Sequence, residues 1–332
     1  MRVLVTGGLG FVGRNVSLKL IRRNHEVTII DSCVPGLGSR NLIDLPRSVS
    51  SVLSDAKILV KDVRDLEGTF FELFDVVIHL AAVVGGRLTI EYQPLAVAED
   101  LEIDSFVIRN WGKGHIKHLV YASSSAAYPV SLQTHSGRRL REEDISFGSE
   151  LGMPDLTYGW SKLTGEFLLN FRKDANLGKT TIIRPFSGFG VDQDSAYPFP
   201  SILRRVAKHS VGSRNFEVWG SGLQERDFIH IDDIIVFMVG IVELSITGTF
   251  NLATGIGTSF RELASHLLRA AGEQEPRVVG KAEMPEGVFS RVGDTSNYFA
   301  ALEEYGLPLP NSIDKVISSN YQSWINYIRM YG

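Results

Sequence analysis

TGGLGFVG, residues 6–13, stands between a short apolar run and a longer amphipathic segment. Its glycines at positions 7, 10 and 13 follow the spacing GxxGxxG. Without side chains there, the backbone can approach a pyrophosphate closely, and the free N–H groups at the start of a following helix can hold its charge. The stretch therefore predicts a strand, a turn and a helix that bind a dinucleotide. Taken alone, it could also be only a tight strand-to-helix turn.

Up to about residue 183, short β-branched runs alternate with longer amphipathic segments. This alternation is typical of βαβ units on a parallel sheet. The clearest helix is expected at residues 11–23. Strands are expected at residues 2–6, 26–30, 57–60, 76–80, 118–122 and 180–183, each apolar enough to be covered on both faces. The predicted class is α/β, with a Rossmann-type doubly wound parallel sheet.

After Pro185 the pattern changes to proline-rich and polar loops, among them Tyr197-Pro198-Phe199-Pro200, which either borders a substrate pocket or forms a rigid loop. A strand and a helix resume at 228–241. A chain of 332 residues has room for two domains. We expect a cofactor domain of residues 1–185 plus about 226–255, which return to the main sheet. A smaller, interleaved C-terminal substrate domain would comprise about 186–225 and 256–332.

The composition is that of a folded globular protein, with 44% hydrophobic residues, 22% charged residues and a net charge of −4. No basic run could follow a phosphate backbone, so nucleic-acid binding is not expected. The start is too short in apolar residues for a signal peptide or a membrane span, which favours a cytoplasmic protein. The single cysteine, Cys33, excludes an internal disulfide and a cysteine-cluster metal site, and no metal is expected.

Polar and small residues follow the predicted strands at the edge where parallel strands end. Asp31 could accept both ribose hydroxyls of an adenosine, and its charge would repel a 2′-phosphate, favouring NAD over NADP. Each aspartate alone could be a turn residue, but the set favours a cofactor site. The residues expected to bind NAD are Gly7, Gly10, Phe11, Val12, Gly13, Asp31, Asp62, Val63, Leu80, Ala81, Ala82, Tyr158, Lys162 and Pro185.

The chemistry is predicted from Tyr158-Gly159-Trp160-Ser161-Lys162, in which Tyr158 and Lys162 share one helix face. A phenol with a pKa of about 10 is a poor base at neutral pH. A neighbouring ammonium favours phenolate, so we expect a lowered pKa for Tyr158 and a role as general base and acid. Lys162 would also donate to the nicotinamide ribose. One of the three serines at 123–125, which follow the fifth strand, could polarise the reacting oxygen. An isolated YxxxK would be ordinary helix surface, but here a glycine fingerprint and a serine-rich strand end precede it.

TGGLGFVG, HLAA, YASSSAAYP and YGWSK resemble the extended short-chain dehydrogenase/reductase family over nearly the whole chain. The closest pattern is that of NAD-dependent nucleotide-sugar enzymes such as UDP-glucose 4-epimerases and GDP-mannose 3,5-epimerases. The resemblance implies a catalytic triad of Ser124, Tyr158 and Lys162. It also implies a homodimer formed through helices near 96–111 and 158–174. The acids Glu99, Asp100, Glu102 and Asp104 would make the first of these a solvated helix instead.

Two segments of the second half resemble the family's nucleotide-diphosphate clamp, namely residues 216–222 with 226–233, and RVGD at 291–294. The resemblance implies that arginines bind the diphosphate and that an acid contacts ribose; guanidinium groups suit phosphate oxygens. The expected ligand is a UDP- or GDP-linked sugar. The residues expected to bind it are Ser124, Ser125, Ser187, Arg226, Arg291 and Asp294.

Departures from the family pattern reduce the number of reactions that are expected for this sequence. Ser125-Ala126 stand where dehydratases carry Asp-Glu, which disfavours dehydration. Ala126 also replaces the cysteine of the 3,5-epimerases, although Gly85-Gly86 matches them. Ser187, and the acids around Asp100–Glu102, stand where the family has asparagine. We therefore expect epimerisation at C4 through a transient bound 4-keto sugar. The alternatives are an NAD(P)H-dependent 4-keto-sugar reductase and a non-catalytic dinucleotide-binding protein.

Overall fold

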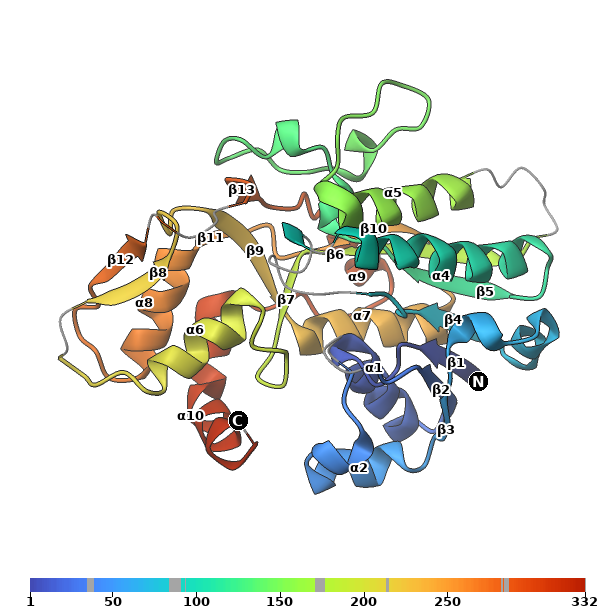
Figure 1. Ribbon diagram of the computed structural model, residues 1–332, viewed down its shortest axis with the longest axis horizontal. Coiled ribbons are helices and arrows are strands. Elements are labelled where there is room, and N and C mark those ends of the chain that lie inside the picture. The colour runs from blue at the N-terminus through green and yellow to red at the C-terminus, as the bar shows by residue number, and fades with distance from the viewer. Residues whose placement is uncertain are drawn as a thin grey trace.

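A parallel sheet forms the centre of the molecule (Figure 1). The computed structural model describes residues 1–34, 39–83, 91–92, 94–170, 177–212, 215–281, 283 and 287–331. Within these ranges seven strands pair side by side, every pair parallel. In spatial order they are β10 (Gly248–Leu252), β6 (Lys179–Pro185), β5 (His118–Ala122), β4 (Val76–His79), β1 (Arg2–Thr6), β2 (Glu26–Asp31) and β3 (Lys57–Val60).

Helices cover both faces of this sheet because successive strand residues point to opposite sides. On β1, Val3 and Val5 belong to one buried cluster and Leu4 to another. The first cluster includes residues of α1 (Phe11–Arg22), α2 (Arg47–Leu53), α7 (Ile231–Leu244) and α9 (Ser296–Glu304). The second includes residues of α4 (Pro94–Gly112) and α5 (Leu156–Asn170). The predicted Rossmann-type fold is confirmed, and the expected strands and first helix are correct to within two residues at their ends.

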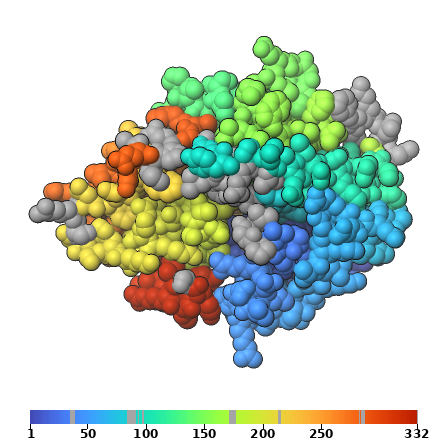
Figure 2. Space-filling model, viewed as in Figure 1, coloured from blue at the N-terminus to red at the C-terminus, as the bar shows by residue number. Residues whose placement is uncertain are grey.

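A second body of structure is built from the later segments and lies to one side of the main sheet (Figure 1), and its yellow, orange and red atoms fill the left of the molecule in Figure 2. Its own buried cluster joins Phe199, Leu203, Phe228, Leu267 and Trp324. Its elements are β7 (Ser187–Phe189), α6 (Pro198–Val206), β8 (Phe216–Trp219), β9 (Glu225–His230), β11 (Gly257–Ser259), α8 (Phe260–Ala270), β12 (Val278–Lys281), β13 (Ser290–Arg291) and α10 (Ile313–Tyr331).

Two expectations about this half are corrected. Strand β9 pairs with β7, β11 and β13 in a separate small sheet, so of residues 226–255 only β10 joins the main sheet while α7 covers it. Pro198 and Pro200 do not make a rigid loop but lie in the first turn of α6, where proline is tolerated because the first N–H groups have no helical partner. The domain boundaries themselves stay a prediction. Within the described ranges, no helix is both long and apolar enough to cross a membrane.

Candidate active site

The glycine-rich turn brings β1, α1 and the end of β4 into close contact. Gly7 has a φ of +66°, and a Cβ added there would lie 2.7 Å from the backbone nitrogen of Ala81. A Cβ on Gly13 would lie 2.2 Å from the carbonyl oxygen of Gly7. Gly10 is the N-cap of α1, so Phe11 and Val12 present the first N–H groups of the helix. The turn thus has the shape and polarity that a pyrophosphate needs.

Asp31 at the end of β2 fixes the other side of this turn. Its carboxylate is buried and accepts one hydrogen bond from the N–H of Leu9 and one from that of Cys33, each at 2.9 Å. A carboxylate has about four acceptor positions, so both oxygens can still accept ribose hydroxyls. A 2′-phosphate would face this buried anion. The cradle and the carboxylate therefore fit NAD.

The other predicted cofactor residues follow the strands of the main sheet at the same end. One of them, Asp62, is already bonded to another side chain. Asp62 follows β3 and caps a short 3₁₀ turn that begins at Val63. Both Asp62 oxygens are bonded to the Arg64 guanidinium at 3.0 and 2.8 Å, which holds the pKa of Asp62 below its usual value. Leu80 to Ala82 follow β4, and Pro185 ends β6. Their contact with a cofactor stays a prediction.

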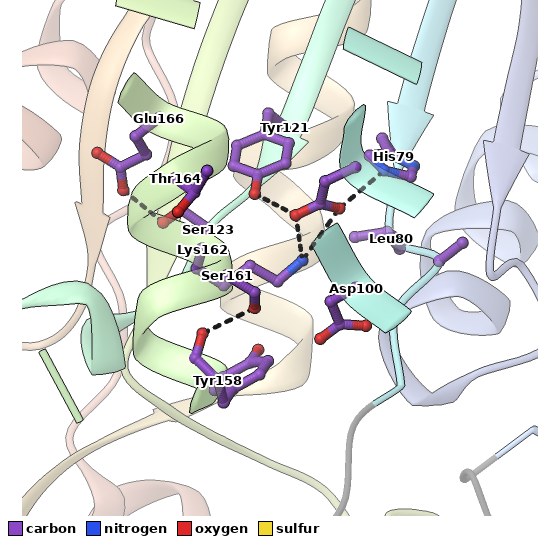
Figure 3. A network of polar contacts seen from close by, with 12 residues as sticks. His79, Leu80, Asp100, Tyr121, Ser123, Tyr158, Ser161, Lys162, Thr164 and Glu166 are labelled. Atoms are coloured by element: carbon purple, nitrogen blue, oxygen red, sulfur yellow. Dashed lines mark hydrogen bonds and ion pairs between the residues drawn. The ribbon is translucent and has the colours of Figure 1, made fainter. Parts of the chain in front are cut away.

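The predicted triad is assembled from β5 and α5. Ser124 follows β5, and its hydroxyl accepts from the N–H of Ala126 at 3.1 Å. Tyr158, in the first turns of α5, lies close enough for this hydroxyl to favour the ionised form of its phenol, which acts to lower its pKa. Lys162 lies one turn further along α5 than Tyr158 and is buried (Figure 3). The three side chains therefore meet at one place, which supports their predicted roles.

The ammonium of Lys162 is bonded to a carboxylate from the neighbouring helix α4. Its Nζ lies 3.2 and 3.4 Å from the two oxygens of Asp104, and both side chains are less than 5% exposed. The same carboxylate accepts from Tyr121 Oη at 2.5 Å and lies 3.1 Å from His79 Nε2 (Figure 3). His79 Nδ1 in turn lies 2.7 Å from the Thr6 hydroxyl. Strands β1, β4 and β5 are thus linked to α4 and α5 by one buried polar network.

The expected lowering of the Tyr158 pKa is wrong for the protein without ligands. Burial raises this pKa above its ordinary value, and the nearby carboxylates of Asp100 and Asp104 raise it further. The charge of Lys162 and the hydroxyl of Ser124 oppose the shift without reversing it. Because Asp104 balances the ammonium, Lys162 stabilises a phenolate less than the YxxxK spacing alone suggests. The Lys162 pKa is itself raised, mainly by Asp104 and Asp100 acting against burial, so the lysine stays protonated.

Asp104 and Asp100 are the site residues that sequence reasoning missed. Both are buried, whereas Glu102 between them is 72% exposed. The idea of a fully solvated α4 is therefore wrong for one face. The two aspartates lie four residues apart and share that face with buried Val107 and Trp111. Acids at helical spacing among apolar residues were the available sequence evidence.

The two predicted phosphate-binding arginines lie side by side on neighbouring strands. Arg226 of β9 and Arg291 of β13 are direct partners in a parallel pairing. Buried Asp227 holds this region together by accepting from the N–H groups of Gly255 at 2.9 Å and Gly293 at 3.3 Å, and from Thr254. Two guanidinium groups at adjacent positions suit a diphosphate.

Both arginines also make contacts within the protein. Arg291 donates to Gln133 Oε1 at 2.6 Å and to Asp155 Oδ2 at 2.7 Å, which ties β13 to the start of the helix that carries Tyr158. Arg226 lies over the Phe260 ring at 5.6 Å and donates to the backbone of Glu225. A diphosphate would have to share these groups, so their role in binding stays a prediction.

The remaining predicted substrate residues lie in three places. Ser125 is buried in the 3₁₀ turn after Ser124, and Ser187 begins β7. Asp294 accepts from the N–H of Ser296 at 3.0 Å, and hydrogen bonds from Ser296 lower its pKa. Tyr197 belongs to the segment predicted to border a substrate pocket; burial raises the pKa of its phenol, and Tyr158 raises it further. Gly85-Gly86, and residues 171–174 of the expected dimer helix, lie outside the described residues.

Residues 3–253 match the model of the NAD dependent epimerase/dehydratase family. The chain belongs to this family. A dTDP-4-dehydro-6-deoxy-D-allose reductase of a Streptomyces species is 27% identical and covers 94% of both chains. The UDP-glucose 4-epimerase of Mycolicibacterium smegmatis is 25% identical over 89% of this chain and 88% of its own. The Thermus thermophilus UDP-glucose 4-epimerase, solved with NAD, has a TM-score of 0.75 at 22% identity and covers 98% of this chain and 99% of that one.

Family membership confirms the predicted resemblance, the enzyme class and NAD as the cofactor. The glycine cradle and buried Asp31 provide a structural reason for that cofactor in this epimerase/dehydratase chain. The relatives include both an epimerase and a reductase. Membership alone leaves the reaction at the level of nucleotide-sugar epimerases, dehydratases and reductases.

Proposed function

We propose that the protein is a nucleotide-sugar epimerase that inverts C4 through a bound 4-keto sugar. The observation that carries the proposal is that Ser124, after β5, and Tyr158, on α5, lie close together beside a buried, protonated Lys162. This is a complete set for moving one proton at one carbon. The acid that an elimination of water would need is lacking at 125–126, where the chain has Ser and Ala.

Each side chain has a defined task in this reaction. Tyr158 Oη takes the proton of the C4 hydroxyl and returns it after the sugar has turned over. Ser124 hydrogen-bonds the same sugar oxygen, and Lys162 holds the phenol in place and opposes its raised pKa. NAD, when bound, supplies the chemistry of removing and restoring a hydride. Binding of substrate and cofactor must lower the Tyr158 pKa from its raised value, because burial keeps the phenol protonated in the free protein.

The substrate class follows from the paired arginines. A nucleoside diphosphate presents adjacent phosphates, and Arg226 and Arg291 lie at directly paired positions of the small sheet. The contact between Arg291 and Asp155 places this sheet next to the start of α5. A ligand held by the arginines could therefore reach Tyr158 with its sugar. UDP- and GDP-linked hexoses are the substrates to test.

The test is to incubate the purified protein with UDP- and GDP-hexoses and catalytic NAD, and to identify the products by NMR. We expect interconversion of C4 epimers without net formation of NADH. Consumption of cofactor in proportion to product would contradict the proposal.

A 4-keto-sugar reductase is the second candidate, because a relative with that activity covers 94% of the chain. It would use the same triad in one direction only. The two candidates differ in cofactor turnover, since an epimerase regenerates its cofactor in each cycle and a reductase must exchange it. Supplying a nucleotide 4-keto sugar with NADH or NADPH and following absorbance at 340 nm separates them: steady oxidation over many turnovers indicates the reductase.

We also propose a homodimer formed through α4 and α5. These helices pack together and expose apolar side chains, Leu101 on α4 and Phe167 and Leu168 on α5. Burying them against a second copy would remove this surface from water. Light scattering should give twice the mass of the chain, and Leu168→Glu should shift it toward the monomer. A wild-type monomer at micromolar concentration would refute the dimer.

A further inference from the structure

Two carboxylates of α4, those of Asp100 and Asp104, lie at the catalytic centre, whereas α5 contributes a single cation there, Lys162. Asp104 binds Lys162 directly. Asp100, one turn earlier on α4, is fully buried, and its Oδ1 accepts from the N–H of Val83 at 2.5 Å. Its Oδ2 has no hydrogen-bond partner among the residues that the structure describes. Asp100 is close enough to Lys162 and Tyr158 to affect the charge of both.

These three groups carry one net negative charge when both aspartates are ionised. The partners of Asp104 leave this balance unchanged. Tyr121 is a neutral donor, since burial and Asp104 raise its pKa well above the usual value. Thr6 can donate to His79 Nδ1 while accepting from Leu80 and Ala81, and His79 can then donate from Nε2 to Asp104. Burial raises the pKa of Asp100 to about 6, so this group is mainly charged above neutral pH.

The neighbouring buried pair offers no compensating charge. Glu166 on α5 is bonded to Arg184 by two hydrogen bonds of 2.9 and 2.5 Å, so these two groups cancel. Among the residues that the structure describes, nothing else offsets this negative charge, which lies beside Leu80, Tyr158 and Lys162, where the nicotinamide end of the cofactor is predicted to lie (Figure 3). The nicotinamide ring is cationic in NAD⁺ and neutral in NADH. Surplus negative charge in a buried site attracts only the oxidised form.

We infer that Asp100 and Asp104 are positioning residues that make this site bind NAD⁺ more tightly than NADH. The enzyme then holds the oxidised cofactor before the sugar binds. This inference rests on the proposed function for the position of the nicotinamide beside Tyr158. It deepens that function, because a reaction that starts by oxidising a sugar alcohol needs NAD⁺ in place. A one-way reductase would need the opposite preference.

The experiment measures the ratio of the dissociation constants of NADH and NAD⁺ without any sugar. Labelled NAD⁺ on the purified protein is displaced by unlabelled NAD⁺, NADH or ADP-ribose at pH 8. The variants are Asp100→Asn and Asp104→Asn. The matched control is Glu102→Gln, which removes the same charge from the exposed side of the same helix. ADP-ribose lacks the nicotinamide and reports general damage to the site.

We expect the wild-type ratio of NADH to NAD⁺ dissociation constants to exceed one. Asparagine at 100 or 104 should lower it by roughly tenfold, as expected for removing a unit charge about 10 Å from a cation at an effective dielectric constant of about 20. Glu102→Gln should leave it unchanged. A purely structural role would weaken NAD⁺, NADH and ADP-ribose alike and keep the ratio constant.

The inference is overturned if the ratio stays within about twofold of wild type in every aspartate variant that folds. Asp100→Asn alone is sufficient for this decision if Asp104→Asn is insoluble. Because no sugar is present, the result does not depend on which carbon the enzyme inverts. If the ratio of dissociation constants is as expected but the protein has no epimerase activity, the proposed reaction is contradicted and the inference about charge is still supported.

Discussion

Two buried ion pairs attach the catalytic helix α5 to the rest of the molecule, and they differ in their surroundings. Arg184 and Glu166 satisfy each other, with Ser123, Tyr128 and the Glu142 backbone completing their hydrogen bonds. The pair of Lys162 and Asp104 has a second carboxylate, Asp100, beside it. The comparison teaches that burial alone does not define a role: a closed pair stabilises the fold, whereas an unbalanced one sets the charge of a site.

The largest effect is expected at the phenol above the unbalanced pair. Tyr158→Phe should lower turnover by about 10³-fold or more, because Tyr158 is the group proposed to take the proton of the C4 hydroxyl and phenylalanine cannot take it. NAD binding and the free energy of unfolding should stay close to wild type. Tyr321→Phe, on α10, is the control that removes a phenol elsewhere. Unaltered turnover in Tyr158→Phe would assign the wrong base.

The closed pair should show its effect in stability. Glu166→Gln leaves the Arg184 guanidinium buried beside a neutral amide, so we expect unfolding to become easier by about 3–5 kcal/mol. Urea denaturation measures this loss, with Glu102→Gln as the exposed control. The comparison of the two pairs fails if Glu166→Gln lowers turnover far more than stability.

Ionisation of Asp100 should make the free energy of unfolding depend on pH. Its folded-state pKa of about 6 lies above the unfolded value of about 3.9, so the folded protein binds this proton more tightly. That stabilisation is complete below about pH 4 and disappears as the pH rises through 6. An asparagine cannot ionise, so Asp100→Asn should gain about 1–2 kcal/mol relative to wild type between pH 5 and pH 8. Urea curves at both pH values test this, and a constant difference would argue against a buried charge.

A surface ion pair should have the smallest effect on the free energy of unfolding. Lys117 and Asp75 lie 3.2 Å apart at the surface. Water screens them, so Lys117→Met should change the free energy of unfolding by less than about 1 kcal/mol, and this small effect should shrink further in 1 M salt. A loss as large as that of Glu166→Gln would show that burial is not what separates the pairs.

The elements of the fold were predictable because their causes are local. The spacing of Gly7, Gly10 and Gly13 required a tight turn, and β-branched runs between amphipathic segments required parallel strands. Two members of the triad could be named for the same reason, since Tyr158 and Lys162 are one helical turn apart, whereas Ser124 was chosen among three serines by the family resemblance. The position of β9 could not be predicted, because its apolar pattern suits either sheet and only its pairing with β7, β11 and β13 distinguishes them.

By itself, the sequence determined the cofactor turn, the order of strands and helices, and which side chains can carry a proton. The tertiary structure alone decided the charge of the site, since Asp104 and Lys162 are 58 residues apart in the chain and meet only when α4 packs on α5. Charge acts through space and depends on burial. The effect of the acidic residues of α4 on the charge of the site therefore depends on which of its aspartates are buried in the folded protein.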